Sequence, residues 1–125
     1  MSKIVQFFFE LTLQVKLYHW QTKVYARHKA SDKLFQKILD GSDRFMEVYI
    51  GKYGRTNIKI HDKGVKVGNL SDKQMADYLK KSVDFLSKDL HTLNLVNKET
   101  DTDLLTLRDE LLVEINTAIY LFTFE

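Results

Sequence analysis

The chain contains no cysteine and no proline, and glycine is scarce. Without cysteine it can form no disulfide, no thiolate zinc site and no cysteine nucleophile. Without proline, glycine is the main residue that can break a helix, and all five glycines lie between residues 41 and 68. We therefore predict long, unbroken helices toward both ends of the chain.

Long apolar runs and a strong net charge are also missing. No segment has the roughly 18 uninterrupted apolar residues of a membrane span. The apolar stretch at residues 1–20 is broken by Glu10, Gln14 and Lys16, and no small-residue cleavage site follows it. We therefore expect no signal peptide and a cytoplasmic protein. The net charge of +2 is too small to indicate nucleic-acid binding by itself.

What is present fits one helical domain over residues 1–125. Apolar residues recur every three or four positions in four segments, which predicts helices over 2–23, 28 or 31–53, 71–93 and 100 or 101–125. Ser71 is the expected N-cap of the third helix. Between the second and third helices, residues 57–68 alternate around a turn-like "HDKG", which predicts a small β-hairpin. The expected fold is an all-α four-helix bundle with a long crossover between the second and third helices.

The first predicted helix carries two apolar stripes. One stripe suits the bundle core and consists of Ile4, Phe8, Leu11, Val15 and Tyr18. The other lies on roughly the opposite side and consists of Phe9, Leu13, Leu17 and Trp20. A second apolar stripe on a short chain indicates a partner surface, so we expect a homo-oligomer, at least a twofold dimer. The alternative is a terminal helix that is simply rich in apolar residues.

The second predicted helix places histidine and acids beside its apolar stripe. His28 and Asp32 are four residues apart, as are Asp43 and Glu47, so each pair shares a face. The two aspartates lie about 16 Å apart along the helix at ~1.5 Å per residue. Since metal–ligand bonds are about 2 Å, one helix cannot bring both pairs to one ion. Two antiparallel copies about a twofold axis can, and His19 can add an imidazole. The alternative is that the acids form the solvated edge of the helix.

The spacing His28-x3-Asp32-x10-Asp43-x3-Glu47, preceded by His19-Trp20, resembles that of the Dps family, the mini-ferritins. The resemblance implies a ferritin-like bundle that assembles into a hollow dodecamer. It also implies an iron site shared by two subunits. The implied metal ligands are His19, His28 and Asp32 of one subunit and Asp43 and Glu47 of its twofold mate.

The activity implied by this resemblance is oxidation of iron(II) by peroxide or dioxygen, followed by storage of ferric iron and protection from oxidative damage. Iron(II) accepts imidazole and carboxylate ligands, either as a single ion or as a di-iron pair, and other divalent metals remain open. The resemblance assigns Trp20 the role of taking up stray oxidising equivalents, although taken alone it is equally an aromatic packing residue. Nucleic-acid binding is not expected, because the lysine-rich N-terminal tail that some family members use is missing.

Two other functions stay open at this point. One is an inert four-helix bundle that binds another protein, and the other is a dimeric metal-binding protein without a storage shell. The acids Asp101 and Asp103 either complement the dipole of the fourth helix or, as the resemblance to the mini-ferritins implies, line a pore for cations. His61 and His91 are interpreted as surface residues.

Overall fold

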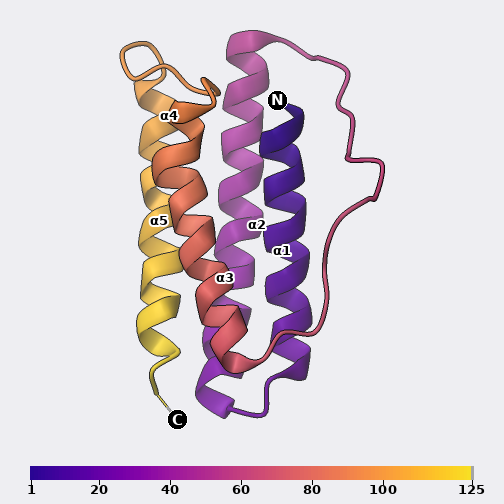
Figure 1. Cartoon of the computed structure of the whole chain (residues 1–125). Coiled ribbons are helices and arrows are strands. Elements are labelled where there is room, and N and C mark those ends of the chain that lie inside the picture. The colour runs from indigo at the N-terminus through magenta and orange to yellow at the C-terminus, as the bar shows by residue number, and fades with distance from the viewer. Residues whose placement is uncertain (125) are drawn as a thin grey trace.

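The computed structural model describes residues 1–124 and contains four long helical rods (Figure 1). Helices α1 (Ser2–Gln21) and α2 (Tyr25–Tyr53) are joined by a three-residue turn. The third rod joins α3 (Asp72–Asp84), the π-helical turn η1 (Phe85–Asp89) and α4 (Leu90–Thr92), and the fourth rod is α5 (Thr102–Leu121). The predicted all-α bundle with a long crossover is confirmed. No helix within residues 1–124 is both long and apolar enough to cross a membrane.

Local sequence signals explain several helix boundaries. Ser71 caps α3 as predicted: its Oγ accepts from the Gln74 N–H at 3.2 Å, and Gln74 Oε1 accepts from the Ser71 N–H at 2.9 Å. Helix α2 ends at Gly54, where φ is +81°, a conformation that favours glycine. Ser31, one of the two expected starts of this helix, is instead buried inside α2, and its Oγ donates to the His28 carbonyl at 3.1 Å.

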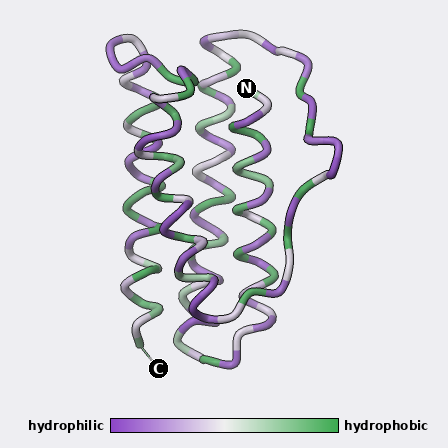
Figure 2. The backbone as a smooth tube through the Cα atoms, viewed as in Figure 1, coloured by the Kyte–Doolittle hydropathy of each residue, from purple (hydrophilic) through white to green (hydrophobic). Residues whose placement is uncertain are grey.

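The core lies between the four rods, and each helix contributes one apolar side to it. Hydrophobic and hydrophilic residues alternate along every helix, as amphipathic helices require (Figure 2). Gly41 allows α2 and α5 to approach closely, because a Cβ there would lie 2.5 Å from Leu111 Cδ2. The predicted core stripe of the first helix is confirmed. The largest fully buried side chains include Ile4, Leu11, Tyr18, Leu34, Ile38, Phe45, Met75, Leu79, Leu104 and Ile115.

Arg27 ties the helices together at one end of the bundle. Its Nη1 donates to Tyr18 Oη at 2.9 Å and to the Asp72 carbonyl at 2.7 Å, and its Nε donates to the Phe122 carbonyl at 3.1 Å. The Tyr18 hydroxyl in turn donates to the Asp72 carboxylate at 2.5 Å. Burial and this carboxylate raise the pKa of Tyr18, so the hydroxyl remains a donor. One guanidinium therefore links α1, α2, α3 and the end of α5.

Asp101 ties helices together at the other end of the bundle. Its fully buried carboxylate accepts from Tyr53 Oη at 2.6 and 2.7 Å and from the Asn97 N–H at 2.8 Å, and Lys52 Nζ lies 3.2 Å away. Burial alone would raise the pKa of Asp101, but these donors outweigh it and the pKa is lowered. Lys52 also pairs with Asp103 at 2.8 Å. In this structure, therefore, Asp101 joins the end of α2 to the start of α5.

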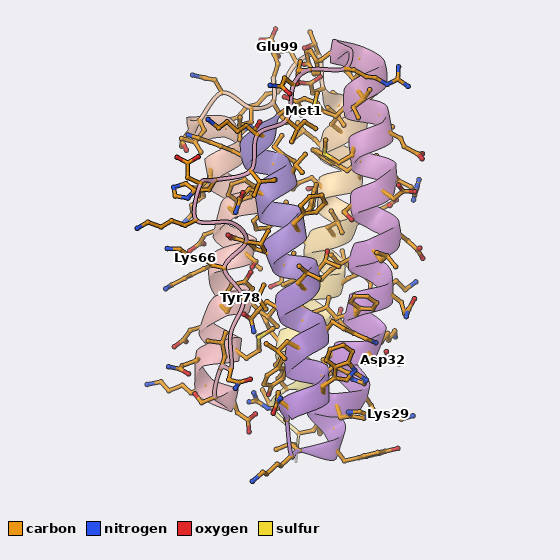
Figure 3. All side chains as sticks on the ribbon, turned by 90° about the vertical axis from the view of Figure 1, so that its right-hand side faces the viewer. Met1, Lys29, Asp32, Lys66, Tyr78 and Glu99 are labelled. Atoms are coloured by element: carbon orange, nitrogen blue, oxygen red, sulfur yellow. The ribbon has the colours of Figure 1, made fainter. Side chains whose placement is uncertain are left out.

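The predicted β-hairpin is wrong. No strand occurs within residues 1–124, and residues 55–70 form an extended strap along the outside of α1 (Figures 1 and 3). Within the strap, the chain turns where the Gly64 N–H donates to the His61 carbonyl at 2.7 Å. The strap has no facing strand, and side chains of α1 bond several of its backbone groups instead.

These side chains form what we call the polar row of α1, namely Ser2, Gln6, Glu10 and Gln14, spaced four residues apart. They accept in turn from the backbone N–H groups of the strap at 3.0, 3.1, 3.2 and 3.2 Å, those of Lys59, His61, Lys66 and Gly68. Gln6 and Gln14 also donate to carbonyls of the strap, those of Gly64 at 3.1 Å and Gly68 at 2.9 Å. The polar row therefore takes the place of a paired strand.

Replacing Gln14 should loosen the strap. Its buried amide makes both bonds to Gly68, so Gln14→Ala leaves a backbone donor and acceptor without their partner. We expect the free energy of unfolding to fall by about 1–3 kcal/mol in urea denaturation, with faster amide exchange at Gly68. The exposed Gln21→Ala is the matched control. Equal stability of the two variants would contradict the role of the polar row.

Asp101 should make the stability of the fold sensitive to acid. Because its folded-state pKa is lowered, its stabilisation is present above the unfolded value of about 3.9 and is lost as the pH falls through the folded pKa. Asp101→Asn should remove this stabilisation and lower the free energy of unfolding at pH 7 by about 1.5–3 kcal/mol. Asp40→Asn, at an exposed position of α2, should keep the wild-type dependence of stability on pH. If the free energy of unfolding of Asp101→Asn varied with pH in parallel with that of wild type, the Asp101 carboxylate would make no acid-sensitive contribution to stability.

Candidate functional site: the face of helices α1 and α2

The second apolar stripe of α1 borders an open groove between α1 and α2. We call this surface the α1–α2 face. Its groove has a volume of about 600 Å³ and is lined by Phe9, Thr12, Leu13, Leu39, Ser42, Asp43, Met46, Ile50 and Ile58, among others. The side chains of Phe9, Leu13 and Leu39 are 49%, 50% and 46% exposed, which is high for large apolar residues placed side by side. The prediction that the second stripe of the first helix lies outside the core is confirmed for Phe9 and Leu13.

Charged groups lie on the same face at two levels. Lys16 Nζ lies 4.6 Å from the centre of the Phe35 ring and 3.8 Å from Asp32 Oδ1. Asp43 borders the groove eleven residues further along α2, which is about 16 Å in a helix. The face therefore carries the Lys16–Asp32 ion pair at one end of its apolar centre and Asp43 at the other. Figure 3 shows Asp32 on one side of α1 and the strap residue Lys66 on the other.

The two histidines predicted as ligands meet across the α1–α2 turn. The rings of His19 and His28 are stacked, with centroids 4.0 Å apart and planes at 18°. His19 Nδ1 lies 2.7 Å from the His28 carbonyl, and His28 Nδ1 lies 2.9 Å from the His19 carbonyl. Because a carbonyl only accepts, each Nδ1 must carry a hydrogen, which leaves Nε2 of the neutral ring bare. His28 also caps one of the last carbonyls of α1.

A bare Nε2 held by an Nδ1–H···O=C bond is the arrangement that metal-binding histidines adopt. The Nε2 of His19 lies 4.0 Å from Asp32 Oδ1, so the structure brings His19, His28 and Asp32 to one end of the α1–α2 face. Their Nδ1 bonds also have a purely structural consequence, since they close the turn between the two helices. The nine-residue spacing of the histidines gave no signal of this stacking.

The other two predicted ligands lie further along α2 and open onto different surfaces. Asp43 borders the groove of the α1–α2 face, whereas Glu47 lines a separate hollow between α2 and α5. Within residues 1–124 no three histidine, aspartate or glutamate side chains gather as a metal ion would require. The predicted ligand set depends on a second copy of the chain, so it stays a prediction.

The remaining predicted residue, Trp20, is 68% exposed near the end of α1, with Lys16 Nζ 5.8 Å from its ring centre. It does not pack in the bundle core, and its redox role stays a prediction. The sequence interpretation missed the polar row. The signal that would have revealed it is the strict four-residue spacing of polar residues beside the core stripe of α1.

The chain matches a family model described as "Family of unknown function (DUF5856)" over residues 19–122. It belongs to this family. A second similarity is to an "Uncharacterized 14.6 kDa protein in mobD-ri intergenic region" of Enterobacteria phage T4, with 51% identity over 37 residues. That match covers 30% of this chain and 29% of the phage protein. No solved structure matches the chain.

Membership of this family corrects the predicted resemblance to the mini-ferritins, which is wrong. The matching family model is one of unknown function and the phage relative is uncharacterised, so neither supports a Dps or ferritin-like identity. The motif of two histidines and three acids is consistent with ordinary helix spacing, since residues four and eleven apart always share a face of an α-helix. The dodecameric shell rested on that resemblance alone and is withdrawn with it.

Proposed function

We propose that this protein is a self-associating helical module whose two copies pair through the α1–α2 face. The observation that carries this proposal is the open groove bordered by Phe9, Leu13 and Leu39, each about half exposed. Contiguous apolar surface of this kind is uncommon on monomeric proteins and is typical of interaction sites. The face lies on two long helices of one rigid bundle, so little conformational entropy would be lost on binding.

The positions of the charges favour a second copy as the partner. Lys16 lies level with Asp32, and Asp43 lies three turns further along α2. A twofold axis crossing the face near Leu13 and Leu39 would pair the apolar centre with itself. It would also set Lys16 of each copy, with Asp32 beside it, opposite Asp43 of the other. Such a self-complementary surface is what a twofold dimer requires.

The size of the face also fits this proposal. Twenty residues of α1 extend about 30 Å, and two helices side by side are about 20 Å wide, which gives a face on the order of 600 Å². A stable dimer buries about 800 Å² of accessible surface per partner. Accessible surface exceeds the flat outline of a face because side chains project from it, so the two values are of the same scale.

A charge placed in the centre of the face should separate the copies. We expect wild type to have the mass of a dimer in light scattering after size exclusion, and Leu13→Asp to have the mass of a monomer with unchanged helical circular dichroism. The matched control is Val113→Asp on α5, where the side chain is 61% exposed, and it should remain a dimer. Wild type that stays monomeric at every concentration would contradict the proposal, as would equal masses for the two variants.

A second candidate function is binding of a divalent metal ion between the two copies. The specific observation in its favour is the stacked pair of His19 and His28, each with a bare Nε2, of which that of His19 lies 4.0 Å from Asp32 Oδ1. In the antiparallel dimer this end of the face meets the end that carries Asp43 of the second copy. Imidazole and carboxylate ligands suit iron(II), and oxidation by peroxide or dioxygen is a reaction open to iron held this way.

Metal binding should raise the thermal stability of the folded protein. An ion that binds only the native state at 100 times its Kd stabilises it by about 2.7 kcal/mol. We expect the melting temperature to rise with anaerobic iron(II) and with cobalt(II) in wild type, but not in His28→Ala. His61→Ala, which removes a histidine of the strap, should respond like wild type. The metal proposal fails if wild type shows no rise, or if His28→Ala shows the same rise.

A further inference from the structure

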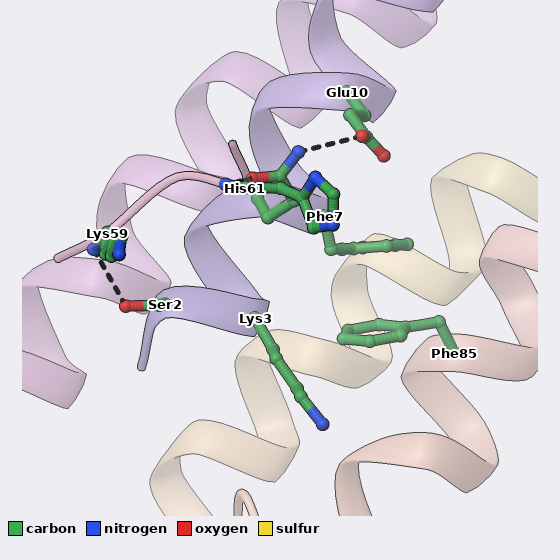
Figure 4. Close-up of a pocket in the computed structure, with 8 residues that line it drawn as sticks. Ser2, Lys3, Phe7, Glu10, Lys59, His61 and Phe85 are labelled. Atoms are coloured by element: carbon green, nitrogen blue, oxygen red, sulfur yellow. Dashed lines mark hydrogen bonds between the residues drawn. The ribbon is translucent and has the colours of Figure 1, made fainter. Parts of the chain in front are cut away.

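A second hollow lies on the side of α1 that faces the strap, away from the α1–α2 face. It has a volume of about 380 Å³, within the range of small-molecule sites. Three elements form it: the first half of α1, the strap and the start of η1 (Figure 4). The residues that give it chemical character are Lys3, Phe7, Glu10, Lys59, His61 and Phe85.

The hollow is lined by hydrogen-bond donors and by positively charged groups. Lys3 and Lys59 border it, and no ion pair found within residues 1–124 includes either of them. His61 Nδ1 accepts from the Lys63 N–H at 3.1 Å, so the ring hydrogen of the neutral form is on Nε2 and is available as a donor. Two ammonium groups and an imidazole N–H suit an anion.

The acid in the hollow, Glu10, is already engaged by the protein. Its Oε1 accepts from Gln6 Nε2 at 2.9 Å and from the Lys66 N–H at 3.2 Å. The charge of this carboxylate therefore serves to hold the strap. The charges of Lys3 and Lys59 together exceed the single negative charge of Glu10, so the hollow has a net positive charge.

An aromatic pair forms the other wall of the hollow. The rings of Phe7 and Phe85 are stacked, with centroids 4.1 Å apart and planes at 14° (Figure 4). Phe85 is the first residue of η1, where the Leu90 N–H donates to the Phe85 carbonyl five residues back. Single π-helical turns inside α-helices occur frequently at functional sites. Both rings are only partly buried, so they present apolar surface beside the cations.

The polar row of α1 fixes the cationic side of the hollow in place. The Lys59 N–H donates to Ser2 Oγ at 3.0 Å and the His61 N–H donates to Gln6 Oε1 at 3.1 Å. Lys59 and His61, two of the three residues that supply donors, are therefore held by their own backbone to the helix that supplies Phe7. A site held in this way loses less entropy when a ligand binds.

We propose that this hollow binds a small anion that carries a planar ring, that is, an aromatic phosphate or carboxylate. The ring packs against Phe7 and Phe85, and the anionic group lies between Lys3, Lys59 and His61. This site does not depend on pairing of the α1–α2 faces, so the variant Leu13→Asp should bind the same ligands as wild type.

The test is a titration of ¹⁵N-labelled protein followed by NMR, with phenyl phosphate and benzoate as probes. We expect saturable shifts of the amides of Lys59, His61 and Phe85. Inorganic phosphate supplies the charge alone and benzyl alcohol the ring alone, and each should bind about tenfold or more weakly than phenyl phosphate, a difference of ~1.4 kcal/mol. The proposal is overturned if neither aromatic anion shifts these amides, or if either partial probe binds as tightly as phenyl phosphate.

Variants separate a specific site from general attraction to a basic protein. Lys59→Gln and Phe85→Leu should each weaken the binding of phenyl phosphate about tenfold. Amides outside the hollow should keep their wild-type chemical shifts. Lys73→Gln, at an exposed lysine of α3 outside the hollow, should bind like wild type. If Lys59→Gln and Lys73→Gln weakened the binding of phenyl phosphate equally, the net charge of the protein would explain the binding. That result would overturn the proposal.

Discussion

The structure depends on the way helix α1 divides its surface among the core, the strap and the solvent. One stripe of apolar residues enters the core, and the polar row of Ser2, Gln6, Glu10 and Gln14 binds the backbone of the strap. Because an α-helix repeats every 3.6 residues, rows spaced by three and four residues form continuous stripes, and only a few stripes fit around one helix. With the core and the strap placed, the stripe of Phe9 and Leu13 is left about half exposed beside the open groove between α1 and α2.

The ends of the bundle hold this arrangement in place. Arg27 joins four chain segments at one end, and the buried carboxylate of Asp101 joins α2 to α5 at the other. Both are polar groups whose partners satisfy them, so they fix the helices relative to one another without leaving a buried charge unpaired. The α1–α2 face and the hollow beside the strap are therefore two rigid surfaces on opposite sides of one helix. The first is apolar with charges at its ends, and the second is cationic with an aromatic wall.

Much of the fold was predictable from local patterns. The four helices, the core stripe of α1 and the cap at Ser71 follow from periodicity and capping chemistry, which depend on neighbouring residues. The strap was not predictable in this way. Its backbone groups can be bonded by a neighbouring strand or by side chains from a distant helix, and both cases give the same alternating pattern of apolar residues, here Ile58, Ile60, Val65 and Val67. The stacking of His19 on His28 likewise depends on a three-residue turn. The predicted family was wrong because spacing along a single helix carries little information about ancestry.

The antiparallel pairing of two α1–α2 faces can be tested by cysteine cross-linking without background, because the chain has no cysteine. Lys16→Cys and Asp43→Cys would be made as separate single variants, oxidised alone and then oxidised as a mixture. We expect a disulfide-linked dimer in the mixture, joining position 16 of one copy to position 43 of the other, and little cross-linking of either variant alone. Cross-linking of each variant with itself, or no preference for the mixed product, would contradict this pairing.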